Sequence, residues 1–325
     1  MVDVIEYRGW KNNLRLSNGE VELVVTLDVG PRVISYRLPN GVNVLKNYDA
    51  MMGGTGEAEW QIRGGHRFWL APEDLTRTYF PDNRPVKWEP LGPRDLSPAK
   101  PGFTAAPIEN HGARFTPPPE TEYGIQKVME LRLAERGTRV DVTLRVTNVG
   151  TVPTELAPWG PTVMAPGGVE IIPLPPKKNH PGHPKNAQSP ADYGPNQELV
   201  LWPYFDFADT RWTFGAKYAL LRQDVNKGPT KIGLAHREGW VGYLNSGVLF
   251  VKRFDYREGA VYPDLGTRYQ TFSNEDMLEM ETVGELVTLQ PGESAELTEA
   301  WELYGNVPPV ATEADVDRVI LPLLK

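Results

Sequence analysis

Frequent interruption by glycine and proline is the feature that most constrains the fold of this chain. The 325 residues include 31 glycines and 31 prolines. Glycine destabilises a helix, and proline removes a backbone donor and breaks it, so long helices are incompatible with this pattern. Short strands joined by turns tolerate it. The sequence therefore predicts an all-β protein.

Alternation of apolar and polar residues marks the clearest strands. Residues 126–133 and 139–148 show this alternation and flank a turn at Arg136-Gly137, which is typical of two neighbouring antiparallel strands. Further strands are expected at 21–27, 32–38, 155–164, 216–222, 231–235, 239–245, 248–255, 277–282 and 295–304. With no repeat of fixed period, these strands predict one large β-sandwich domain over residues 1–325.

Two long segments and the C-terminus depart from the strand pattern. Residues 47–122 and 173–198 are rich in proline and glycine and show no regular period. An irregular stretch as long as 47–122 usually carries function. Residues 312–325 favour a short helix instead, because Thr312 can cap it and Val316, Val319, Ile320 and Leu323 follow helical spacing.

Charge and cysteine content exclude several classes of partner. The net charge of −8 and the pI near 5.3 argue against a nucleic-acid binder and against an anionic membrane surface. No segment is apolar enough to span a membrane, and residues 1–8 do not read as a secretory signal. The absence of cysteine excludes disulfides and thiolate chemistry and fits a cytoplasmic protein. The oligomeric state is left open.

Two segments concentrate residues suited to acid/base chemistry. Residues 63–69 place His66, Arg63 and Arg67 beside Trp69 in a glycine-bent stretch. Residues 273–284 contain Glu279 and Glu281, which lie on the same face of the expected strand because side chains alternate. A carboxylate and a histidine brought together by the fold would form an acid/base pair, and two adjacent carboxylates would raise the pKa of one of them.

Each of these residues also has a purely structural interpretation. His66 could form a hydrogen bond with a backbone carbonyl, and the arginines could form surface ion pairs. The two glutamates could lie on the solvent-facing edge of a strand. Trp69 and Trp159 could stack on a sugar or fill the core, and with 9 tryptophans in the chain the aromatic content alone does not decide. His180 and His183 in a proline-rich loop lack further ligands nearby, so no metal site is expected.

The order of these features resembles the galactose mutarotase-like superfamily, which includes the aldose 1-epimerases. Residues 16–33 are similar to the strand, Gly-Pro-Arg-Val turn and second strand that open the family. The Gly64-Gly65-His66 segment is similar to a His-Gly-Gly-like segment of the family. Residues 277–282 resemble the strand of the catalytic glutamate, and residues 289–294 resemble the Pro-Gly-Glu turn after it. Residues 64–73 together with 278–282 resemble an uncharacterised bacterial subgroup.

The resemblance implies a β-supersandwich with few short helices and a small-molecule sugar as ligand. It implies Glu281 as catalytic base and His66 as acid or ligand, without cofactor or metal. Glu279, Arg67, Arg63, Trp69 and Trp159 would bind the sugar. The family's second histidine, however, has no counterpart at residues 156–164. His111 and His236 remain as alternative acids.

Three functions are therefore compatible with the sequence. The first is a mutarotase-like epimerase that interconverts the anomers of a free aldose or uronate by acid/base catalysis. The second is a carbohydrate-binding protein without catalysis, which would account for the missing histidine. The third is a protein related to glycan lyases or hydrolases on the same fold. Whether the chain is an enzyme is open at this point.

Overall fold

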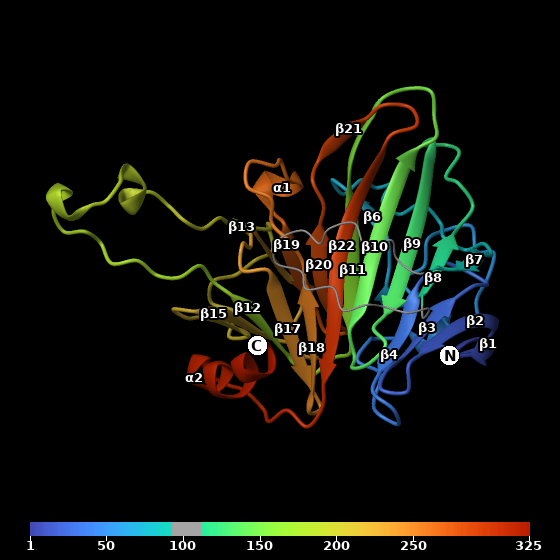
Figure 1. Ribbon diagram of the computed structural model, residues 1–325, viewed down its shortest axis with the longest axis horizontal. Coiled ribbons are helices and arrows are strands. Elements are labelled where there is room, and N and C mark those ends of the chain that lie inside the picture. Colours follow the sequence, from blue (N-terminus) through green and yellow to red (C-terminus); the bar gives the residue numbers. More distant parts are fainter. Residues whose placement is uncertain (93–111) are drawn as a thin grey trace.

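Antiparallel pairing of short strands builds two large sheets in the computed structural model, which describes residues 1–92 and 112–325 (Figure 1). The twelve-stranded sheet runs in the order β1 (Val2–Tyr7), β2 (Trp10–Ser17), β3 (Glu22–Thr26), β4 (Val33–Arg37), β5 (Gly65–His66), β11 (Thr154–Met164), β20 (Leu278–Val283), β19 (Tyr269–Ser273), β16 (Thr230–Leu234) and β13 (Leu199–Leu201). Two further strands, β6 (Trp69–Ala71) and β21 (Val287–Leu289), pair with β11.

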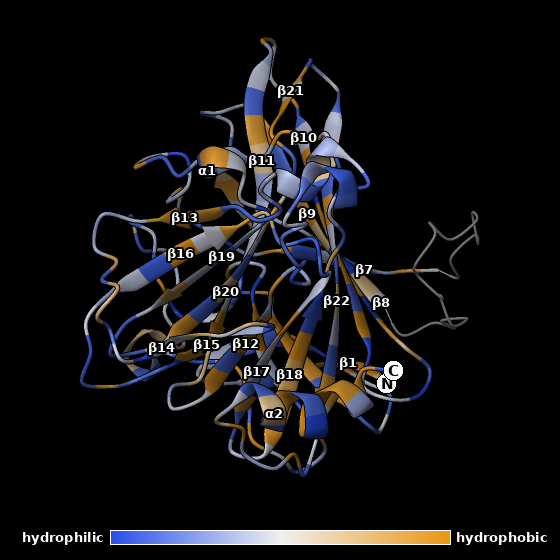
Figure 2. Cartoon of the chain, turned by 90° about the vertical axis from the view of Figure 1, so that its left-hand side faces the viewer, coloured by the Kyte–Doolittle hydropathy of each residue, from blue (hydrophilic) through white to orange (hydrophobic). Residues whose placement is uncertain are grey.

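The ten-stranded sheet forms the second layer. Its order is β14 (Trp212–Phe214), β15 (Tyr218–Arg222), β12 (Val169–Pro173), β17 (Trp240–Asn245), β18 (Val248–Arg253), β22 (Ser294–Tyr304), β10 (Val140–Asn148), β9 (Ile125–Leu133), β8 (Gly112–Thr116) and β7 (Lys87–Pro90). Figure 2 shows the two layers from the side, with β13, β16 and β19 above and β14, β15 and β12 below. The predicted all-β sandwich is confirmed.

Alternation along the strands places the core between the sheets. In β9 and β10 every second residue is buried, so Met129 and Leu144 pack inward while their neighbours Glu130 and Arg145 remain partly exposed. One continuous apolar cluster contains residues of both sheets, among them Leu23, Met280 and Trp301. Burial of this cluster supplies the main favourable term for folding.

Helical structure is confined to short pieces. The predicted C-terminal helix is confirmed as three consecutive turns, α2 (Glu313–Asp315), η4 (Val316–Ile320) and η5 (Leu321–Leu323), and Thr312 caps the first of them. The other turns are η1 (Asp49–Met51), η2 (Pro184–Asn186), η3 (Pro190–Tyr193) and α1 (Pro263–Gly266). In the described part of the chain, no helix is long and apolar enough to cross a membrane.

The structure corrects the sequence-based assignments in several places. The short strands β12, β13, β14, β19 and β21 were not among the expected strands. The hairpin of β1 and β2 was not expected, and its second strand buries Leu14 and Leu16 in the core. The stretch 47–122, expected to be mostly irregular, contributes the four short strands β5 to β8 among its described residues. These strands are two to five residues long, too short for the period of their side chains to be visible in the sequence.

Residues 174–198 leave the sandwich as a projecting arm. The arm connects β12 of one sheet to β13 of the other and extends away from both layers (Figure 1). None of its residues is fully buried. His180 and His183 each accept a hydrogen bond from a backbone N–H two residues further on, so both histidines serve turns within the arm.

Two polar clusters are buried between the sheets behind β20. In the first, Lys252 Nζ donates to Glu299 Oε1 at 3.2 Å and to the carbonyl oxygens of Gly160 and Met280 at 2.9 and 3.1 Å. In the second, Glu170 accepts hydrogen bonds from Tyr269 and Thr271. Burial raises the pKa of Glu170 to about 8, so its carboxyl is largely protonated at neutral pH.

The Glu170→Gln variant is expected to gain stability relative to wild type as the pH rises. Between the unfolded pKa near 4.5 and the folded value of about 8, only the folded state holds the proton, so wild-type stability falls with increasing pH. The upper limit of this slope is about 1.4 kcal/mol per pH unit, and glutamine cannot contribute to it. Urea unfolding at about pH 5, 6.5 and 8 measures the difference. A difference that does not change with pH would show that Glu170 ionises normally.

Candidate functional site

A cleft opens on the outer face of the twelve-stranded sheet, the face turned away from the ten-stranded sheet. Its cavity volume is about 310 Å³. Strands β11, β16, β19 and β20 form its floor, and loops after β6 and β13 contribute to its walls. The lining residues are Trp60, Ile62, Arg67, Trp69, Glu73, Tyr79, Trp159, Tyr204, Lys231, Phe272, Met277, Glu279 and Glu281. A cavity of this size, lined by several aromatic rings and a few charged groups, is typical of small-molecule sites.

Strand β20 presents Glu279 and Glu281 to the cleft together. Because side chains alternate along a strand, both face outward while Met280 and Thr282 face the core between the sheets. The neighbouring β11 is in register with them, with Pro161 opposite Glu281. Both carboxylates were expected on one face of this strand, and the structure places both in the cleft lining.

Glu281 is a carboxyl group of the cleft with a strongly raised pKa. Its side chain is 1% exposed, and burial raises its pKa to about 7. The charge of Lys231 opposes this increase in pKa, and the charge of Glu279 adds to it. A carboxyl group with such a pKa is divided between its acid and base forms at neutral pH, which suits proton transfer.

Lys231 contacts Glu281 directly and was not among the residues expected at the site. Its Nζ lies 3.0 and 3.3 Å from the two carboxylate oxygens. The ammonium group is also within 5.2 Å of the ring centre of Trp159 and 4.9 Å of that of Trp202. The sequence gives only a weak indication that Lys231 lies at the site. Ile232 and Leu234 face the core, so the alternation of side chains along β16 turns Lys231 to the opposite face.

Arg67 forms the second charged contact. One guanidinium nitrogen lies 2.7 Å from Glu279 Oε1, and the guanidinium carbon stacks 3.8 Å from the ring centre of Trp69. Its Nε and Nη1 atoms are buried without a hydrogen-bond acceptor among the described residues. Two buried donors next to the cleft are therefore left without a partner in the described part of the chain.

Aromatic rings form one wall of the cleft. Trp69 packs edge-on against Tyr79 and Trp159, with ring centres 5.0 and 5.3 Å apart, and Trp60 lies against Trp69 and Tyr79. Trp159 Nε1 is buried and has no acceptor in the described part of the chain. Both tryptophans expected at the site thus lie in the cleft lining, and one supplies a further unpartnered donor.

His66 does not lie in the cleft. Its side chain is fully buried on the inner face of the sheet, where Nδ1 is 2.9 Å from Thr162 Oγ1 and the ring packs edge-on against Trp301. Burial lowers its pKa well below the usual value, so the imidazole is neutral. Gly64 and Gly65, both at positive φ, bring the backbone so close to the carbonyl oxygens of Lys46 and Val33 that a Cβ would collide with them.

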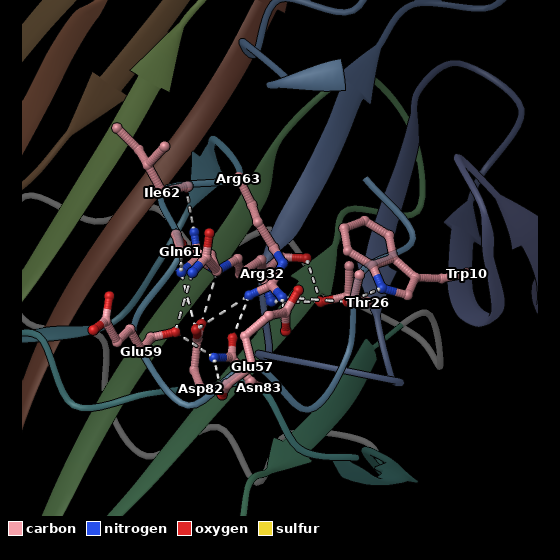
Figure 3. A network of polar contacts seen from close by, with 11 residues as sticks. Trp10, Thr26, Arg32, Glu57, Glu59, Gln61, Ile62, Arg63, Asp82 and Asn83 are labelled. Carbon is pink, nitrogen blue, oxygen red and sulfur yellow. Dashed lines mark hydrogen bonds and ion pairs between the residues drawn. The ribbon is translucent and has the colours of Figure 1, made fainter. Parts of the chain in front are cut away.

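Arg63 is also absent from the cleft lining and instead stabilises the loop that carries Trp60. It donates to Glu57 at 2.6 Å and to Asn83, while the neighbouring Arg32 binds Asp82 and two backbone carbonyls (Figure 3). Arg63 and Arg32 are fully buried. The network fixes residues 57–63 at the edge of the cleft.

Of the two alternative histidines, His236 does not line the cleft. His236 is buried, its Nε2 is 2.8 Å from the carbonyl oxygen of Trp240, and burial lowers its pKa to about 4. His111 lies outside the described residues. Within residues 1–92 and 112–325, no group of three His, Asp or Glu side chains is arranged to hold a metal ion.

Comparison with known proteins identifies the fold. No protein-family model and no curated protein matches the sequence. A TPR-domain containing protein from Parabacteroides distasonis is 14% identical with a TM-score of 0.57; the match covers 92% of this chain but 48% of that one, so this chain spans about half of its length.

Two further solved structures match over their whole length. A galactose mutarotase-like protein from Lactobacillus casei is 11% identical with a TM-score of 0.55, covering 90% of this chain and 100% of that one. A galactose mutarotase related enzyme from Lactobacillus acidophilus is 8% identical with a TM-score of 0.51, covering 92% and 100%. Identity this low establishes the fold but not the activity. The chain therefore shares the β-supersandwich fold of these galactose mutarotase-like structures.

Proposed function

We propose that this protein is a carbohydrate-active enzyme that interconverts the anomers of a free aldose or uronate, with Glu281 as the catalytic base. The observation that carries the proposal is a buried carboxyl group with a pKa of about 7 on the floor of an aromatic-walled cleft. A general base is most effective when its pKa lies near the working pH. The fold supports a carbohydrate-related role at a coarser level.

The reaction requires only proton transfers. Glu281 removes the proton of the anomeric hydroxyl while the ring oxygen is protonated, and the ring opens to the free aldehyde. Rotation about the C1–C2 bond and reclosure by the reverse transfers then produce the other anomer. No cofactor is needed, because the anomeric carbon is a hemiacetal carbon, which opens and recloses by proton transfers alone.

The remaining lining residues are suited to hold the sugar. The rings of Trp69 and Trp159 offer apolar faces to the C–H groups of a pyranose. The unpartnered Nε and Nη1 of Arg67 and Nε1 of Trp159 can donate to hydroxyl or carboxylate oxygens. Glu279, held by Arg67, can accept from a hydroxyl group. Arg63 acts on this site only through the loop that it stabilises.

Exchange between α and β anomers, followed by NMR for glucose, galactose and galacturonate, tests the proposal. The enzyme is expected to accelerate exchange of at least one sugar in proportion to protein concentration, beyond the rate in buffer alone. Galacturonate is included because the free donors of Arg67 could bind its carboxylate. Broadened sugar resonances without faster exchange would instead indicate a binding protein.

A further inference from the structure

The contact between Lys231 and Glu281 joins a proton donor to a proton acceptor within the cleft. Both oxygens of Glu281 lie within 3.3 Å of Lys231 Nζ, and the two side chains are 6% and 1% exposed. Lys231 stands on β16 and Glu281 on β20, with β19 between them. A buried ion pair gains little net stability compared with apolar side chains, so its presence at the floor of a cleft calls for another reason.

Aromatic rings and a carboxylate lie around the Nζ atom of Lys231. Its distances to the ring centres of Trp159 and Trp202 are 5.2 and 4.9 Å, within the range of cation–π contacts. The carboxylate of Glu281 lies 3.0 Å away. Lys231 therefore places an N–H donor beside the base, where a substrate would need one.

The other titratable groups of the cleft lining are poorer proton donors. Arg67 does not release a proton at physiological pH. Burial raises the pKa of Tyr79 and Tyr204 above the ordinary value, which makes them weaker acids still. Glu279 is paired with Arg67.

The last group is Glu73, which accepts a hydrogen bond from Tyr79 at an exposed position of the cleft lining. No histidine belongs to the lining within the described residues. Glu170 and Lys252 lie on the other side of the sheet. Their charges influence the pKa of Glu281 and of each other by Coulombic interaction and not by hydrogen bonding.

We propose that Lys231 is the general acid of the reaction, an inference that rests on the proposed function of the cleft. The anomeric oxygen and the ring oxygen are bonded to the same carbon, so a donor and an acceptor about 3 Å apart can reach both atoms together. Glu281 takes the proton of the anomeric hydroxyl, and Lys231 gives a proton to the ring oxygen. The C1–O5 bond breaks as the C1–O1 double bond forms.

The protons balance over a full cycle. Ring opening leaves a neutral amine on Lys231 and a neutral carboxyl on Glu281. After rotation about C1–C2, Lys231 takes the proton back from the hydroxyl at C5, and Glu281 returns its proton to the aldehyde oxygen. Neither an oxidant nor a second substrate is required.

Rescue of the Lys231→Ala variant by small amines tests this role. The variant is expected to lose about 10²–10⁴-fold in the rate of anomer exchange, the usual contribution of a general acid. Trimethylammonium, which carries an N–H proton, should restore part of the rate in a saturable manner. Tetramethylammonium, which has the same charge and nearly the same size but no N–H, should not. Lys87→Ala, at an exposed position on β7, is the matched control.

The possible results separate the proposals. Equal rescue by both cations, or full activity of Lys231→Ala, would show that Lys231 contributes at most a charge. If neither cation enters the site, Lys231→Arg decides: arginine keeps the charge but releases no proton, so low activity supports the proposal and wild-type activity overturns it. Absence of exchange activity in the wild type would instead refute the proposed function itself.

Discussion

Replacing Glu281 by glutamine is expected to reduce the rate of anomer exchange by about 10²–10⁴-fold, the contribution typical of a positioned general base. Glutamine has the size of glutamate, so it preserves the packing of a side chain that is 1% exposed while removing the proton acceptor. NMR exchange rates for the sugar that the wild type accelerates most provide the measurement. Glu275→Gln, at an exposed position just before β20, is the control.

The pH dependence identifies the base independently of the size of this effect. Wild-type kcat/KM should rise with pH through about 7, because Glu281 acts only when deprotonated. The charged groups that face it are Lys231 from β16, Glu279 from β20 and Arg67 from the segment after β5, and all three influence its pKa. The residual activity of Glu281→Gln should lack this rise. A variant that keeps both the rate and the rise would refute the assignment.

The Lys252→Met variant is expected to be destabilised by about 3–5 kcal/mol, because removing one partner of a buried ion pair leaves the other charge uncompensated. Lys252 and Glu299 are both fully buried, and the remaining donors to Glu299 would be Thr282 and Trp301 Nε1. Loss of the lysine also removes the bonds that join the carbonyls of Gly160 and Met280. Urea unfolding measures the change in the free energy of unfolding.

Two controls make this result interpretable. The double variant Lys252→Met/Glu299→Gln should recover much of the lost stability, because no unpaired charge remains. Arg145→Met breaks the ion pair with Glu296 between β10 and β22 of the same sheet, which is 38% and 44% exposed, and should cost at most about 1 kcal/mol. Equal losses for Lys252→Met and Arg145→Met would contradict the argument.

Features that depend on the local period of the chain could be predicted from the sequence. The alternation of apolar and polar residues in β9 and β10 predicted that both are strands and which of their side chains face inward. The same period placed Glu279 and Glu281 side by side on β20. Helix capping by Thr312 was also readable, since it involves residues three positions apart.

Features that depend on pairing between distant strands could not be predicted. The contact of Lys231 with Glu281 spans 50 residues and requires β16, β19 and β20 to be neighbours in register. His66 and Arg67 are adjacent, so they face opposite sides of the sheet, and the sequence does not show which of them faces the cleft. The role of Arg63 depends on its hydrogen bonds to Glu57, in the loop before it, and to Asn83.

The projecting arm of residues 174–198 is a connection whose length can change at little cost in stability. The arm leaves one sheet after β12 and enters the other at β13. Side-chain hydrogen bonds of His180, Asn186 and Asn196 close within the arm, and next to β13 Glu198 accepts hydrogen bonds from Arg237 outside it. Doubling the length of a flexible loop costs only about 0.6 kcal/mol in closure entropy. Insertions here would leave both sheets and the cleft floor intact, so this connection is where evolution or an engineer could graft an additional module onto the sandwich.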